Sequence, residues 1–170
     1  RLNQPGSLTT FHHARSVSLE GDELIKQFSQ QRQHVDAVPL LVGEHWVLWV
    51  MFTNNNGERA SLFFDSLAAM SEQTKSNLDG LAKACNMKPP VWVRANLQDH
   101  APNGCAVFLM YAMQNIENLP HAPLHALKKV ISDFSKLDED SQKFTIQHGR
   151  AEMLGALADD RSLADMETYV

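Results

Sequence analysis

Residues 38–53 read VPLLVGEHWVLWVMFT, and this stretch decides the fold class. It is rich in β-branched and aromatic residues, and Gly43 divides it into a short strand and a longer buried strand. After it comes NNNG, a run typical of a hairpin turn, and residues 59–64 then predict an antiparallel partner strand that ends at Asp65. Two neighbouring strands of one sheet are therefore expected to carry His45 and Asp65.

Helical patterns flank this hairpin on both sides. Apolar residues recur at helical spacing within residues 19–33, and Ser71 is a good N-cap for a helix that runs to about Cys85. Residues 91–95 then predict a further strand. The expected fold class is therefore α/β of the α+β type, with a mixed central sheet flanked by helices.

Cys105 is expected at the first turn of a core helix. Residues 96–104 are polar and end in the turn pair Asn103-Gly104, which indicates a loop. Residues 106–116 are apolar on nearly every side, which is typical of a central buried helix. A thiol at a helix N-terminus has a lowered pKa, so this position favours a reactive cysteine.

The length of 170 residues predicts one domain. Residues 1–18 show no sustained period and are interpreted as an N-terminal arm, with the single domain at 19–170 and its core at 19–116. The last part, 123–170, is expected to be a polar, helical C-terminal extension. Its expected helices span about residues 123–136, 138–148 and 151–158, with a weaker helical pattern to residue 170.

Composition excludes several classes of partner. The net charge is −5, because 20 Asp and Glu outnumber 15 Lys and Arg, so we expect no nucleic-acid partner. The longest apolar run, Val47 to Phe52, falls far short of the roughly 20 residues of a membrane span, so we expect no membrane partner. Two cysteines, Cys85 and Cys105, are too few for a disulfide scaffold and favour a reducing compartment, the cytosol or nucleus.

Four residues supply the parts of a thiol-based acyl-transfer site. A thiol attacks a carbonyl as the thiolate, so Cys105 needs an imidazole beside it, and His45 is the candidate base. Asp65, on the neighbouring strand, is suited to hold the tautomer and orientation of that imidazole. Gln98, in the loop ahead of Cys105, is suited to donate its amide to an oxyanion alongside the backbone N–H of Cys105.

Each of these residues has a simpler interpretation when taken singly. A lone cysteine at the start of an apolar helix is more often merely buried, His45 alone suits a core histidine, and Asp65 alone suits a helix cap. His100 is nearest to Cys105 in sequence and is the alternative base, whereas Cys85 lies on an apolar helix face and is interpreted as structural. The seven histidines other than His45 show no metal-like spacing, and we expect neither a metal nor a cofactor.

Taken together and in this order, the residues resemble clan CE cysteine peptidases. That clan includes the Ulp/SENP-type proteases of ubiquitin-like proteins, the adenovirus proteinase and bacterial effector deubiquitinases. The resemblance covers residues 19–116, and it departs from the usual motif because Gly104 stands where Asp often precedes the cysteine and Ala106 where Gly usually follows it. It is carried by His45-Trp46-Val47-Leu48, Asp65-Ser66-Leu67, Gln98 and Asn103-Gly104-Cys105.

The resemblance implies a Ulp/adenain-like fold with His45, Asp65, Gln98 and Cys105 as catalytic residues. It also implies that Trp46 contacts the substrate, because the diglycine tail of a ubiquitin-like modifier threads a narrow slot beneath the Trp next to the catalytic His. The implied function is a cysteine isopeptidase that removes ubiquitin or a ubiquitin-like modifier such as SUMO or NEDD8. A compact core with a helical tail is more typical of a bacterial effector, which would act in a host cell.

Two other functions remain open. A YopJ-type acetyltransferase uses a similar residue set with acetyl-CoA, but it usually carries Glu where Asp65 stands and binds a polyphosphate through basic residues. This acidic chain has few Lys/Arg clusters, which disfavours that function. A non-catalytic module that binds a ubiquitin-like protein is the second alternative. Retention of all four candidate residues disfavours such a module.

Overall fold

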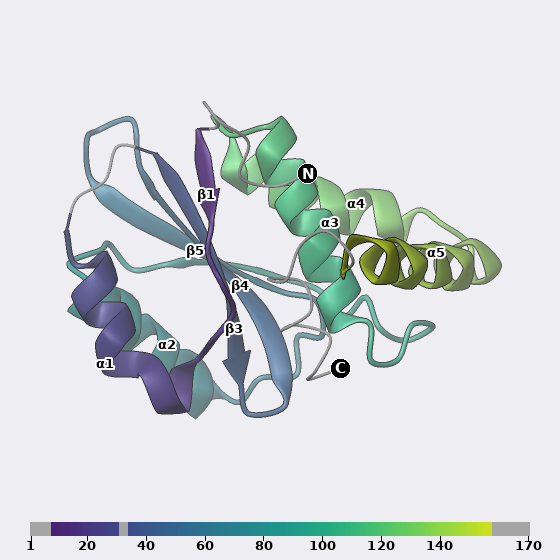
Figure 1. Ribbon diagram of the computed structural model, residues 1–170, viewed down its shortest axis with the longest axis horizontal. Helices are drawn as coiled ribbons and strands as arrows, with labels where there is room; N and C mark the ends of the chain where they lie inside the picture. The colour runs from purple at the N-terminus through teal and green to yellow at the C-terminus, as the bar shows by residue number, and fades with distance from the viewer. Residues whose placement is uncertain (1–7, 31–33, 158–170) are drawn as a thin grey trace.

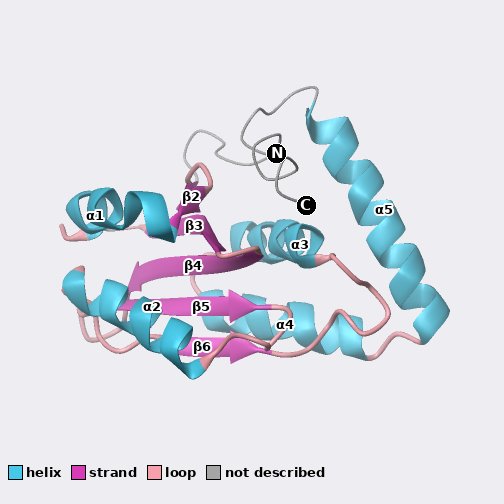
Figure 2. Cartoon of the chain, turned by 90° about the horizontal axis from the view of Figure 1, so that it is seen from below, coloured by secondary structure: helices cyan, strands magenta, loops and turns pink. Residues whose placement is uncertain are grey.

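The computed structural model describes residues 8–30 and 34–157. Within them the predicted α+β architecture is confirmed: a mixed sheet lies between two helical layers (Figures 1 and 2). The elements in chain order are β1 (Thr9–Phe11), β2 (Arg15–Ser16), α1 (Val17–Phe28), β3 (Val35–Val42), β4 (His45–Thr53), β5 (Arg59–Asp65), α2 (Glu72–Ala84), β6 (Val91–Arg94), α3 (Cys105–Asn118), α4 (Pro123–Ser135) and α5 (Glu139–Leu157).

The sheet has the strand order β1-β3-β4-β5-β6, with β2 also paired to β3. The pair β4–β5 is antiparallel, as the hairpin turn predicts, and β3–β4 is antiparallel too. Strands β1, β2 and β6 pair in parallel with their neighbours. The helix pair α1 and α2 covers one face, and α3 and α4 cover the other (Figure 1). Because β4 is buried on both faces, its sequence is a continuous apolar run rather than an alternating one.

The two tryptophans of β4 show how the strand divides the core. Trp46 packs in the core on the α3 side, and Trp49 packs in the core on the side of α1 and α2. Residues three apart on a strand point to opposite faces, which accounts for this split. Figure 2 shows the sheet between these two layers.

Two predictions about the chain ends are wrong within the described residues. Residues 9–11 and 15–16 are not loop but short strands, held to β3 by parallel pairing and by the hydrogen bond from the Val35 N–H to the Leu8 carbonyl (3.0 Å). Such short strands carry too little alternating pattern to be recognised. The two helices expected at 138–148 and 151–158 form one helix, α5.

The other boundaries agree with the sequence to within a few residues. Helix α1 begins two residues earlier than expected and ends at Phe28, and Gln33, its predicted end, lies outside the described residues. Ser71 caps α2 as predicted, with its hydroxyl accepting a hydrogen bond from the Thr74 N–H (3.1 Å). Residues 1–7 of the predicted arm and 158–170 of the predicted C-terminal extension also lie outside the described part.

Candidate active site

A tight turn and a strand end bring His45 and Asp65 together. Val42 pairs with His45 across the β3–β4 hairpin, and Gly43 takes a φ of 65° in the turn between them. His45 is thus the first residue of β4, and Asp65 is the last residue of its antiparallel partner β5, so both lie at the same end of the sheet. The His45 Nε2 and the Asp65 Oδ1 are 2.6 Å apart.

Asp65 is held ionised although its side chain is fully buried. Burial raises the pKa of this carboxyl group, but the hydrogen bonds from His45 and from the Leu67 N–H outweigh burial and lower the pKa below its usual value. The Leu67 N–H lies 3.0 Å from Oδ1. Ala68 adds its own N–H from a left-handed conformation (φ 56°), which L-residues adopt at a cost.

Cys105 is the first residue of α3, and its side chain forms a hydrogen bond with His45. Because the His45 Nε2 is bound to Asp65, Nδ1 is the ring nitrogen that remains for the thiol. Burial lowers the pKa of His45, yet its hydrogen bonds to Asp65 and Cys105 raise that pKa to about 9. The three side chains therefore form a connected carboxylate, imidazole and thiol set.

The thiol itself is shifted toward its reactive form. Burial raises the pKa of Cys105, but the hydrogen bond with His45 and the backbone N–H groups of Trp46 and Ala106 together lower it below the usual value. Only Gly fits at position 104 without rearrangement, because a Cβ there would stand 2.9 Å from the Ala101 carbonyl oxygen. The residue before the thiol thus has a packing reason to be glycine.

Gln98 is anchored to the turn that follows Asp65. Its side-chain Nε2 donates to the Ser66 Oγ (2.9 Å), and the Leu97 N–H donates to the Ser66 carbonyl (2.8 Å). A carboxamide nitrogen carries two hydrogens, so this bond leaves one for a further acceptor. Two successive turns then connect Gln98 to Cys105. The Ala101 N–H donates to the Gln98 carbonyl, and the Gly104 N–H donates to the Ala101 carbonyl (both 3.2 Å). A role of Gln98 toward an oxyanion stays a prediction.

Trp46 is placed next to the site but is covered by protein. Its side chain is 1% exposed and packs in the core that also contains Cys105. Its backbone N–H forms a hydrogen bond with the thiol. Contact between the indole and a substrate stays a prediction.

The alternative residues are placed away from this chemistry. His100 is exposed and its Nδ1 lies 3.8 Å from Glu139 on α5, so it is His45 that contacts Cys105. Cys85 is fully buried, and burial raises the pKa of its thiol to about 11. This environment agrees with a structural cysteine.

Sequence reasoning missed two residues that contact candidate site residues: Ser66, which contacts Gln98, and Arg94, which contacts Asp65. Ser66 stood inside the quoted Asp-Ser-Leu motif, but its bond to Gln98 spans 32 positions and no local pattern indicates it. Arg94 ends β6 and lies in register with Asp65, so the only signal was its place at the end of a predicted strand. Both depend on the pairing of β5 with β6.

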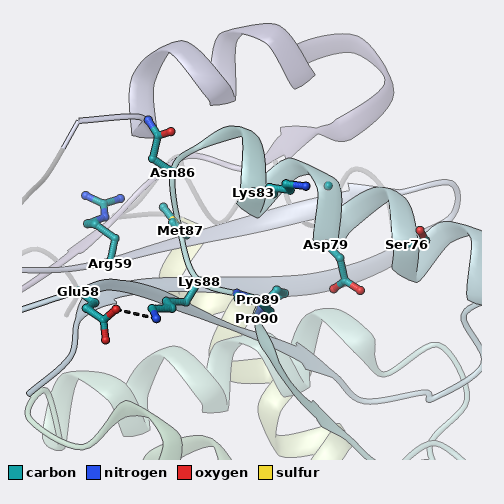
Figure 3. Close-up of a pocket in the computed structure, with 11 residues that line it drawn as sticks. Glu58, Arg59, Ser76, Asp79, Lys83, Asn86, Met87, Lys88, Pro89 and Pro90 are labelled. Atoms are coloured by element: carbon teal, nitrogen blue, oxygen red, sulfur yellow. Dashed lines mark ion pairs between the residues drawn. The ribbon is translucent and has the colours of Figure 1, made fainter. Parts of the chain in front are cut away.

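A separate cavity of about 780 Å³ lies between α2 and the beginning of β5 (Figure 3). Its acidic groups are already engaged, because Glu58 pairs with Lys88 (2.7 Å) and Asp79 accepts from the Trp92 Nε1 (2.8 Å). Neither His45 nor Cys105 lines it. The candidate site is therefore the thiol, imidazole and carboxylate set at the other end of β5.

Neither a metal site nor a membrane-spanning helix is found in the part of the chain that the structure describes. There, no three His, Cys, Asp or Glu side chains gather in a group able to hold a metal ion. None of the described helices has the length and apolar character needed to cross a membrane.

Comparison with known proteins relates the chain to a bacterial group. A family model described as ElaD/SseL-like C-terminal matches residues 1–152. Deubiquitinase SseL of Salmonella typhimurium and that of Salmonella paratyphi A are each 23% identical over 146 residues, covering 83% of this chain. That match takes in 42% of each relative, so the chain spans less than half their length.

Several solved structures share a more distant likeness. Xanthomonas campestris effector protein XopD, solved bound to ubiquitin, has a TM-score of 0.44 at 14% identity, covering 85% of this chain and 81% of that one. A de-sumoylating protease has a TM-score of 0.48 at 12% identity, covering 95% and 78%. Likenesses at this level decide neither activity nor substrate. The family match, by contrast, spans most of the sequence and confirms the resemblance inferred from it: the chain belongs to the ElaD/SseL-like C-terminal family.

Proposed function

We propose that this chain is a cysteine isopeptidase that removes ubiquitin or a ubiquitin-like modifier from a lysine side chain. The observation that carries the proposal is the contact of His45 with both Asp65, at 2.6 Å, and Cys105 at the start of α3. A carboxylate, imidazole and thiol in this arrangement are the parts of a cysteine nucleophile with its base and its orienting group.

In the proposed reaction, the Cys105 proton passes to His45 and the thiolate attacks the carbonyl carbon of the Gly–Lys isopeptide bond. The oxyanion accepts hydrogen bonds from the Gln98 amide and the Cys105 backbone N–H. His45 returns the proton to the lysine amine as the C–N bond breaks, which leaves a thioester on Cys105. Water, deprotonated by His45, then hydrolyses this thioester and regenerates the thiol.

Ubiquitin is the first modifier to test, and SUMO and NEDD8 follow. Support comes from the family match and from relatives named as deubiquitinases. Because the chain spans 42% of such a relative, activity of the whole protein toward any modifier is part of the proposal. Trp46 follows His45 on β4, and we propose that it borders the path of the modifier's diglycine tail.

We place this activity in a reducing compartment, the cytosol or nucleus of a host cell. Both cysteines are free thiols, and the proposed chemistry needs Cys105 to stay reduced. A fusion to a compartment-restricted reporter in infected cells checks this proposal. A signal confined to an oxidising compartment would contradict it.

The test of the proposed function is labelling by ubiquitin, SUMO and NEDD8 probes that carry a thiol-reactive group at the C-terminus. We expect at least one probe to label the wild-type chain and the Cys85→Ala variant but not Cys105→Ala. Cys85→Ala is the matched control because it removes the other free thiol. A folded protein that no probe labels, or one that acetylates itself with acetyl-CoA instead, would contradict the isopeptidase proposal.

A further inference from the structure

The second oxygen of the Asp65 carboxylate faces a cation. The Oδ1 atom accepts hydrogen bonds from His45 and from the Leu67 N–H, whereas Oδ2 lies 3.6 Å from the Arg94 Nε. Strand pairing sets this contact, because β6 runs parallel to β5 with Arg94 in register with Asp65. The two oxygens therefore have different partners on two different strands.

The charge of Arg94 lies next to this buried carboxylate. Asp65 is 0% exposed, whereas Arg94 is 23% exposed, so the carboxylate is buried beneath a cation that reaches toward solvent. A buried charge is costly unless it is paired. Among the described residues Oδ2 has no hydrogen-bond partner, and the Arg94 Nε is beyond hydrogen-bond distance, so the attraction of the charges is what links them.

We propose that Arg94 is a positioning residue of the proposed catalytic set: its guanidinium pairs with Oδ2 and keeps Oδ1 turned toward His45. The inference rests on the proposed function for its effect on turnover, but its effect on the Cys105 thiol is independent of any substrate. Nothing in the sequence motif assigns this role, because Arg94 lies outside every segment that carries the family resemblance.

The groups that face Asp65 determine the sign of the expected effect. They are His45 on β4, Arg94 on β6, and the N–H groups of Leu67 and Ala68 in the loop after β5. Loss of the Arg94 charge raises the pKa of Asp65, because a nearby cation favours the ionised carboxylate. Loss of the guanidinium also leaves Oδ1 free to turn away from His45. The imidazolium is then held less firmly, so the pKa of Cys105, whose thiolate depends on that cation, is expected to rise.

Arg94 also has a contact of purely structural kind. Its guanidinium carbon lies 5.9 Å from the centre of the Trp92 ring, and the Lys75 Nζ lies 5.6 Å from the same ring. Cation–π contacts of this type contribute to stability. Lys75→Gln therefore removes a cation from Trp92 without touching Asp65, and it is the matched control for Arg94→Gln.

The experiment measures the rate of Cys105 alkylation by iodoacetamide against pH, in a Cys85→Ala background, for Arg94→Gln, Arg94→Lys and Lys75→Gln. We expect Arg94→Gln to raise the apparent pKa of Cys105 by about one unit, the size of shift a lost neighbouring cation produces. Arg94→Lys keeps the charge and should restore most of the shift. Lys75→Gln should leave the pKa of Cys105 unchanged.

Turnover of a labelled modifier and a double mutant complete the test. We expect the kcat of Arg94→Gln to fall about tenfold near neutral pH with little change in KM, since a group acting on the nucleophile affects the chemical step. In an Asp65→Asn background, Arg94→Gln should lower kcat no further. An alkylation profile and a kcat that both match the wild type would overturn the inference, even if Arg94→Gln lowers Tm. A shifted alkylation profile in a chain that processes no modifier would instead support it while contradicting the proposed function.

Discussion

His45 is bound on both sides, and its two neighbours set the pH range in which the site is reactive. The reactive state has Cys105 as thiolate and His45 protonated. The pKa of Cys105 lies below its usual value and that of His45 is about 9, so this state exists between the two. At lower pH the thiolate gains a proton, and at higher pH the imidazole loses one.

This range predicts a bell-shaped profile for kcat/KM against pH. The acid limb should follow Cys105 and lie below the ordinary thiol value of about 8.5, and the alkaline limb should follow His45 near 9. His45→Ala should lower kcat by roughly 10²- to 10⁴-fold, since it removes the acid–base group. Steady-state kinetics over this range check the prediction. Activity that rises steadily through pH 9 would contradict it.

Ser66 is the residue on which the position of the Gln98 amide depends. Its Oγ accepts the bond from Gln98 Nε2 at 2.9 Å and is fully buried. Ser66→Ala frees the Gln98 side chain, so we expect kcat to fall about tenfold, less than the roughly 10²- to 10³-fold loss expected for Gln98→Ala.

The matched control for Ser66→Ala is Ser61→Ala. Ser61 is also buried, but it lies within β5, whereas Ser66 directly follows that strand and binds Gln98. Single-turnover rates of both variants, and of Ser66→Ala combined with Gln98→Ala, provide the measurement. The double variant should be no slower than Gln98→Ala alone. Equal and additive losses would show that Ser66 acts independently of Gln98.

The candidate residues could be named from the sequence because each belongs to a local pattern. His45 opens an apolar strand, Asp65 closes the next strand, and Cys105 opens an apolar helix. Their supporting contacts could not be named, because Arg94 reaches Asp65 only through β5–β6 register and Ser66 reaches Gln98 across a loop. Local patterns predict where a side chain lies in its element, whereas pairing between distant elements decides what it touches.

At the scale of elements, α5 shows how packing overrides a local signal. Gly149 lies between the two short helices expected at 138–148 and 151–158, yet one helix continues through it. A Cβ at this position would stand 2.4 Å from the Val107 Cγ1 and 2.8 Å from the Tyr111 hydroxyl on α3. Glycine is therefore present because α5 lies close against α3, not because the helix ends.

This packing predicts opposite effects of the same substitution at two helical glycines. Gly149→Ala should lower the free energy of unfolding by about 1–3 kcal/mol, the usual cost of overpacking. Gly80→Ala in α2, where a Cβ meets nothing within 4 Å, should raise it by up to about 1 kcal/mol, the helix propensity difference. Thermal and denaturant unfolding check both variants. A stabilised Gly149→Ala would mean that α5 does not pack on α3 as described.

The short strands β1 and β2 mark the other limit of sequence reasoning about elements. Each pairs in parallel with β3, and neither is long enough to show the alternation of a strand. Long elements such as β4 and α3 were predicted because burial on several sides leaves a continuous apolar signal. The length of an element thus decided whether it was recognised.

At the scale of the whole molecule, one sheet separates two cores and presents the candidate site at one end. The core on the α3 side contains Cys105 and Trp46, and the core on the other side contains Cys85 and Trp49. The two free thiols are therefore in different surroundings, one in contact with His45 and one sealed by burial. Because Cys85 does not contact His45, the Cys85→Ala variant allows the pKa of the Cys105 thiol to be measured alone.

The central claim is that the folded chain activates Cys105 through His45 and Asp65. Titration of the ultraviolet thiolate absorbance, in a Cys85→Ala background and with Cys105→Ala as the blank, tests it without a substrate. We expect the Cys105 thiolate to form below the pKa of an ordinary thiol, and His45→Ala to move that titration upward. A thiol that titrates at or above the ordinary value in the folded protein, unchanged by His45→Ala, would contradict the claim.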